Sequence, residues 1–126
     1  MAKTKESAHD APVYLSDTAR DEWYRVIGAL EESGIYQKID LTALAAYCTH
    51  YANWRRAIEA VNNEKLTYAT ETGFDRPNAN LKIAQDESIR MRSYMAELGL
   101  TPSSRNRIAP KKAEDGDEFD DFLKKK

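Results

Sequence analysis

Apolar residues recur at helical spacing in three separate stretches of this chain. In the first stretch, Ser16 is suited to cap the start of a helix, and Gly34 is suited to end it in the left-handed conformation. We therefore expect a first helix over about residues 17–33. The apolar face of this helix consists of Ala19, Trp23, Val26, Ile27 and Leu30.

The second stretch begins after Asp40, a good N-cap residue, and continues to about Asn62. The short connection through Gly34 suits an αα-hairpin or a helix-turn-helix arrangement with the first helix. The second helix is too apolar for a simple recognition helix, so the pattern does not predict groove reading. Its expected buried side consists of Leu41, Leu44, Ala45, Cys48, Ala52, Ile58 and Val61.

The helical pattern stops between residues 65 and 75. Residues 66–70 are β-prone, and Thr72-Gly73 is a turn signal. Pro77 closes this segment, because it disfavours helix at the residue before it. A short hairpin or an ordered loop is therefore expected between the second and third helices.

The third helix is the clearest element, capped by Asn78 or Asn80 and ending at Leu98 before Gly99. Its apolar residues follow a heptad-like seam. This seam has two interpretations: packing inside the chain against the first two helices, or a contact between subunits. The candidate subunit interface consists of Leu81, Ala84, Met91, Met95 and Leu98.

Together these elements predict a mainly α protein with three principal helices, a short β-prone hairpin or loop between the second and third, and disordered termini. Residues 1–15 are expected to form a disordered leader, residues 16–109 a helical domain, and residues 110–126 a disordered tail with a short amphipathic patch. A body of this size buries a limited share of its surface, which favours assembly into an oligomer.

The net charge of −2 argues against a simple basic coat for DNA, but the charge is uneven along the chain. Residues 41–109 hold nine Lys or Arg against seven Asp or Glu, so a nucleic acid would be favoured there. For any single arginine, the simpler interpretation is a solvated helix face. The candidate DNA-binding residues are Arg55, Arg56, Lys65, Arg76, Lys82, Arg105 and Arg107.

Catalytic chemistry is not expected from this sequence. Cys48 and His50 are two positions apart on one helix, so they point in different directions and cannot act together as nucleophile and base. A single cysteine gives neither an intrachain disulfide nor a cysteine-rich metal site, and no phosphate-cradling glycine loop occurs. We therefore predict no catalytic residue, no metal site, no cofactor and, since no apolar run is long enough, no membrane span in a cytosolic protein.

The tail contains an acidic-aromatic patch in which Phe119, Phe122 and Leu123 have the i, i+3, i+4 spacing of one amphipathic turn. Such a segment fits the groove of a partner protein. The candidate docking residues are Phe119, Asp120, Asp121, Phe122 and Leu123.

The segment Leu98-Gly99-Leu100-Thr101-Pro102, followed by Ser103-Ser104-Arg105, closely resembles the closing motif of a phage terminase small-subunit family found in siphophages and prophages. The resemblance covers about residues 16–109, with Arg76 departing from the His or Asn that the family often has before the proline. Other positions that agree in order and spacing are Trp23, Leu30, Gly34, Asp40, Tyr51, Arg55, Gly73 and Pro77.

This resemblance implies a non-catalytic helical subunit that assembles as a ring in the cytoplasm of the infected bacterial host. It implies binding of double-stranded viral DNA at the packaging start site, and recruitment and modulation of a large ATPase-nuclease subunit. We expect the tail patch to dock that large subunit. Two other interpretations stay open: a dimeric prophage transcription regulator on a palindromic site, and a helical adaptor that binds only protein.

Overall fold

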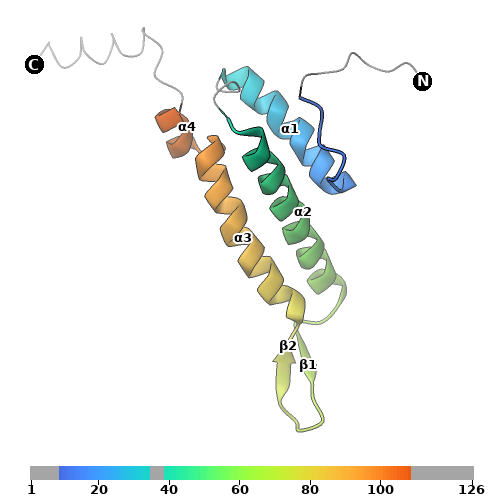
Figure 1. The fold of residues 1–126 in the computed structure, drawn as a ribbon. Helices are drawn as coiled ribbons and strands as arrows, with labels where there is room; N and C mark the ends of the chain where they lie inside the picture. The colour runs from blue at the N-terminus through green and yellow to red at the C-terminus, as the bar shows by residue number, and fades with distance from the viewer. Residues whose placement is uncertain (1–8, 35–38, 109–126) are drawn as a thin grey trace, which may run out of the picture.

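The computed structural model describes residues 9–34 and 39–108. The elements in these ranges are α1 (Asp17–Ser33), α2 (Leu41–Asn63), β1 (Thr67–Ala69), β2 (Asp75–Pro77), α3 (Ala79–Leu98) and α4 (Pro102–Ile108) (Figure 1). The predicted mainly α fold with three principal helices is confirmed, and of the two alternatives after α2 the hairpin is correct. Its strands pair antiparallel, with Tyr68 opposite Arg76. The tail patch, Phe119 to Leu123, lies outside the described residues.

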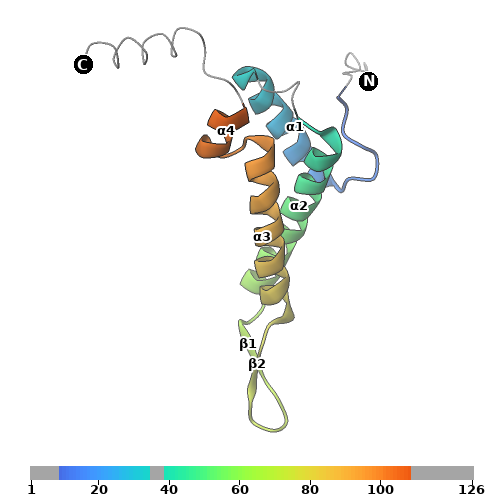
Figure 2. The ribbon, with the colours of Figure 1, turned by 60° about the vertical axis from the view of Figure 1, so that its left-hand side comes forward.

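The helices α2 and α3 lie side by side and form the long axis of the molecule (Figures 1 and 2). The β1–β2 hairpin continues this axis beyond the two helices. The first helix packs on the half of α2 that is farther from the hairpin, and α4 lies at the other end of α3. The molecule therefore has two different ends, a hairpin end and an α4 end.

The helix boundaries follow the capping residues expected from the sequence. The Ser16 side chain accepts from the Ala19 N–H at 3.3 Å, and Asp40 accepts from the Thr42 N–H at 2.8 Å. Gly34 and Gly99 end α1 and α3 with φ of 78° and 74°, a left-handed conformation that favours glycine. These caps satisfy backbone groups that the helices leave unpaired.

The hydrophobic core lies between α1, the first half of α2 and the end of α3. Trp23, Leu44 and Leu98 are its largest fully buried side chains. The members of this core on α2 run from Ala43 to Ala52. The start of α1 reaches Arg55, Arg56 and Glu59 of α2, and beyond this level α2 and α3 continue as a pair of helices without α1. The hairpin half of the molecule is therefore thinner than the half that α1 covers.

Residues 9–15, which the sequence analysis placed in the disordered leader, pack against α1 in the structure. The indole N–H of Trp23 donates to the His9 carbonyl oxygen at 2.8 Å, and Leu15 is buried in the core. The reason is that α1 alone cannot cover its own apolar face. The packed body therefore begins before Ser16.

Asn78 holds the hairpin to the start of α3. Its side-chain oxygen accepts from the Asn80 N–H at 2.9 Å, so Asn78 is the N-cap of α3. Its amide donates at 2.9 Å to both the Glu64 carboxylate and the Lys65 carbonyl oxygen. Its backbone N–H also donates to the Leu66 carbonyl oxygen at 2.7 Å. One buried side chain therefore joins the end of α2, the hairpin and α3.

Candidate nucleic-acid and assembly surfaces

The structure does not bring the seven candidate DNA-binding residues into one patch. Arg105 and Arg107 lie on α4, whereas Lys65 and Arg76 lie at the hairpin. The two groups are separated by α3, whose 20 residues extend for about 30 Å at about 1.5 Å per residue. A single compact DNA contact therefore cannot use all seven residues.

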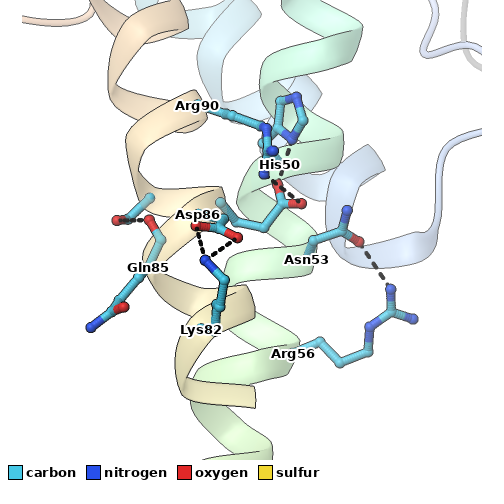
Figure 3. Close-up of polar contacts among 9 residues, drawn as sticks. His50, Asn53, Arg56, Lys82, Gln85, Asp86 and Arg90 are labelled. Carbon is cyan, nitrogen blue, oxygen red and sulfur yellow. Dashed lines mark hydrogen bonds and ion pairs between the residues drawn. The ribbon is translucent and has the colours of Figure 1, made fainter. Parts of the chain in front are cut away.

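In the middle of the molecule, the candidate cations are already engaged with neighbours (Figure 3). Lys82 turns along α3 to Asp86, with an N–O distance of 3.4 Å. Arg56 donates to the Asn53 side-chain oxygen at 2.9 Å. Arg55 pairs with Glu59 at 3.1 Å and lies over the Tyr51 ring. The two exposed ion pairs, Lys82–Asp86 and Arg55–Glu59, reduce the positive charge that the middle of the molecule presents, whereas the amide of Asn53 leaves the charge of Arg56 in place.

At the hairpin, acidic residues outnumber the two candidate cations. Residues 64–78 contain Lys65 and Arg76 together with Glu64, Glu71 and Asp75. The Glu64 carboxylate lies at the base of the hairpin, where it accepts a hydrogen bond from the Asn78 amide and adds negative charge. The hairpin therefore presents little net attraction to a phosphate backbone.

The second half of α3 and α4 carry a local excess of arginine. Residues 88–108 contain four arginines and one acidic residue, Glu97. Arg92, which the sequence analysis did not single out, lines a groove between α3 and α4 together with Ser103. Arg107 lies one helical turn after Ser103, so it shares that side of α4. Arg92 makes no ion pair within the described ranges. We call Arg92, Arg105 and Arg107 the α4-end cluster.

A sequence signal for Arg92 was available in hindsight. It stands two positions after Arg90, and Arg90 has Glu87 one turn earlier on the same helix face, at 3.9 Å. The residues one turn before Arg92 are Ser88 at i−4 and Ile89 at i−3, and neither carries a negative charge that could pair with the Arg92 guanidinium. Counting charges within one helical turn, and not over a long stretch of sequence, distinguishes Arg90, which has an acidic neighbour, from Arg92, which has none.

The five seam residues on α3 have different surroundings. Ala84 and Leu98 are buried inside the chain, with 5% and 1% of their surface exposed. Met91 and Met95 are partly buried and pack against the core. Leu81 is partly exposed near the hairpin. Four of the seam residues therefore contribute to the fold of a single chain.

Beside Leu81, an open apolar groove of about 770 Å³ runs along the first turns of α3. We call it the α3 groove. Ile83, 46% exposed, lies in it, and the nearby hairpin exposes Phe74 at 75%. The lining residues are Pro77, Asn78, Ala79, Leu81, Lys82, Ile83, Gln85 and Asp86. An open apolar groove with an exposed isoleucine in it is a candidate protein contact surface.

Buried polar side chains are bonded to one another and serve the fold. Glu22 is 4% exposed, receives two hydrogen bonds from Arg25, and accepts from the Tyr47 hydroxyl at 2.6 Å. Burial and the bond to Glu22 raise the pKa of Tyr47, and the bond to Glu22 raises the pKa of Arg25. This group fixes α1 against α2. Sequence reasoning did not identify this group, because Tyr47 stands 25 positions after Glu22 and no local spacing links them.

His50 and Glu87 join α2 to α3 in a second polar contact (Figure 3). The Nδ1 atom of His50 lies 2.5 Å from a Glu87 carboxylate oxygen, and the His50 ring stacks on Tyr94. Cys48 is fully buried, and burial raises the pKa of its thiol to about 12. A thiol with such a pKa is a poor nucleophile at neutral pH.

Other chemistry finds little support in the described part of the chain. Within residues 9–34 and 39–108, no three His, Cys, Asp or Glu side chains are placed to hold a metal ion. In the same ranges, no helix is both long enough and apolar enough to cross a membrane.

These features define a class before any comparison. The chain is an elongated helical protein, with arginines gathered toward one end, an apolar groove near the opposite end, and polar interior groups that are used for folding.

Comparison with known families then identifies the chain more closely. Residues 19–115 match the family model described as phage terminase, small subunit, so the chain belongs to that family. Small subunits of this family are generally non-catalytic. No curated protein and no solved structure matches the chain.

Proposed function

We propose that this chain is the DNA-recognition subunit of a phage packaging terminase, with no catalytic activity of its own. It assembles as a ring in the cytoplasm of the infected host, binds double-stranded viral DNA at the packaging start site and recruits the large ATPase-nuclease subunit. The observation that carries this proposal is the separation of the basic α4 end from the apolar α3 groove, in a chain of this family.

DNA binds at the α4 end in this proposal. Arg92 and Arg107 are exposed and without an acidic partner in the described structure, and Arg105 donates only to the Gly99 carbonyl oxygen, at 3.4 Å. Unpaired arginines grip phosphates without first having to leave a carboxylate. Arg55, Arg56 and Lys82 would have to break existing contacts, and Lys65 and Arg76 sit among acids. They contribute less.

Subunits meet through the hairpin half of the molecule. There the α2–α3 pair lacks the cover of α1, and Leu81 and Ile83 expose apolar surface in the α3 groove. Burying such surface between copies is favourable at about 25 cal/mol per Å². Contacts at this end leave the α4 ends of neighbouring subunits accessible to DNA.

The tail patch docks the large subunit. Phe119, Phe122 and Leu123 supply an apolar edge, and Asp120 and Asp121 supply charge. A short amphipathic turn of this kind is recognised in a groove of a partner.

The test uses the full chain, duplexes tiled across the phage genome that encodes it, and the large subunit. We expect a discrete multi-subunit mass by light scattering, salt-dependent preference for one region of the genome, and a changed ATPase rate of the large subunit. A stable dimer on a palindrome would instead support a transcription regulator. Protein binding without salt-dependent DNA binding would support an adaptor.

A further inference from the structure

The groove between α3 and α4 combines an apolar floor with a cationic rim. It has a volume of about 340 Å³ and is lined by Arg92, Met95, Ala96, Thr101 and Ser103. Met95 is partly buried, so its side chain is held by the core beneath the groove. Arg92 makes no ion pair in the described part of the chain. We call this the α3–α4 groove.

The chain itself contains a segment of complementary chemistry. Six of the eight residues from 114 to 121 are acidic, and Phe119 and Phe122 stand within or directly after this run. Residues 88–108 are basic by four arginines to one glutamate. An aromatic side chain on the apolar floor, with carboxylates facing the arginines, satisfies both surfaces at once.

The distance along the chain also favours this groove. Ser103 and Ile108 belong to the same seven-residue helix, so the described chain ends about 10 Å from the groove. Phe119 follows Ile108 by eleven residues, which span up to about 40 Å when extended. The centre of the α3 groove, at Lys82, lies about 20 Å from Met95 along α3, and its one lysine, Lys82, is already paired with Asp86. The α3–α4 groove is both closer and more basic.

We propose that the acidic-aromatic segment folds back onto the α3–α4 groove of its own chain. Phe122 lies over Met95 and Ala96, and Asp120 and Asp121 face Arg92 and Arg107. The docking is argued from the groove and the tail sequence and does not depend on the proposed function. Its consequence, competition between the tail and DNA for the α4-end cluster, rests on the proposed function. A large subunit that captures the same segment then frees these arginines for DNA.

Photo-crosslinking in the full chain tests the docking. Phe122 is replaced by the photoreactive residue p-benzoylphenylalanine, and the irradiated protein is digested with trypsin. We expect a crosslink at monomer mass that maps to the peptide from Ser93 to Arg105. Arg92→Glu removes one cleavage site, so the corresponding peptide runs from Met91 to Arg105; its crosslink yield should fall severalfold, and adding Asp121→Arg should restore it. Arg90→Glu is the matched control and should leave the yield unchanged, since Arg90 already pairs with Glu87.

Crosslinks between chains, crosslinks scattered along the chain, or a yield indifferent to Arg92→Glu would each overturn the docking. Competition has a separate test. Phe119→Ala with Phe122→Ala keeps every charge, and should tighten DNA binding by about tenfold if a tail held at millimolar effective concentration is released. A specific crosslink with no gain in DNA affinity would uphold the docking and reject the placement of DNA at the α4 end.

Discussion

Arg90 and Arg92 are two positions apart on α3, yet the fold gives them different partners. Arg90 lies 3.9 Å from Glu87, whereas Arg92 lines the α3–α4 groove without an acidic neighbour. At the scale of single residues, the accessible charge for DNA therefore depends on which arginine lacks a carboxylate.

Arg92→Ala should weaken DNA binding and reduce the slope of log K against log salt concentration by about one, because one phosphate contact is lost. Arg90→Ala is the matched control and should change the slope much less. Fluorescence anisotropy with a labelled duplex at several salt concentrations measures both. Equal slopes for the two variants would argue against the α4 end as the DNA site.

The buried thiol of Cys48 should make the free energy of unfolding depend on pH in the alkaline range. Its thiol has an ordinary pKa of 9.0 when unfolded and about 12 in the fold, because burial disfavours the thiolate. Between these values the unfolded chain loses a proton that the folded chain keeps. The free energy of unfolding therefore falls as pH rises, by up to about 1.4 kcal/mol per pH unit from this group.

Cys48→Ala should make that decline shallower between pH 9 and 12, as followed by urea unfolding at each pH. Tyr47, whose pKa is also raised, should still contribute at the upper end. An unchanged slope would show that the thiol titrates alike in both states.

At the scale of elements, Asn78 connects three parts of the molecule through one buried amide. Asn78→Ala removes the cap of α3 and leaves the Lys65 carbonyl and the Glu64 carboxylate without their amide donor. We expect a loss of about 1–3 kcal/mol in the free energy of unfolding, measured by chemical denaturation.

Asn80→Ala provides the control for this change. Asn80 is the next asparagine on the same helix, and only its backbone N–H is bonded to Asn78. Alanine also favours helix at this position. A loss of similar size in both variants would contradict the role assigned to the Asn78 side chain.

At the scale of the whole molecule, the unequal coverage of α2 and α3 predicts where copies meet. Ile83→Asp places a charge in the α3 groove and should shift the assembly toward monomer in light scattering, because the charge would be buried without a partner. Ile89→Asp is the control. Ile89 is more exposed, at 69%, but lies outside this groove. Disruption by Ile89→Asp alone would move the proposed contact to another face.

Helix ends were predictable because capping is a local matter. The Ser16, Asp40 and Asn78 caps bond to N–H groups two or three positions later, and Gly34 and Gly99 adopt the left-handed backbone that few other residues tolerate. The hairpin was predictable as one of two alternatives, since β-prone residues and a turn glycine stand between two helices. The packing of residues 9–15 was not, because a segment with no periodicity depends on what it covers.

The candidate DNA surface was only partly predictable. Arg105 and Arg107 were identified from charge and lie in the α4-end cluster, but Arg92 was missed and Lys65 and Arg76 lie at the opposite end of α3. A count of charges along the chain gives a balance without positions. Such a count does not distinguish two cations that lie side by side in the fold from two that lie at opposite ends of it.

The sequence by itself therefore determined the helices, their caps and the hairpin position, because each depends on residues within a few positions. Only the tertiary structure decided that Glu22 is buried beneath Arg25 and Tyr47, that His50 meets Glu87 at 37 positions away, and which arginines stay unpaired. Those outcomes depend on which helix faces meet, and meeting faces are set by burial of apolar surface across the whole chain rather than by any local spacing.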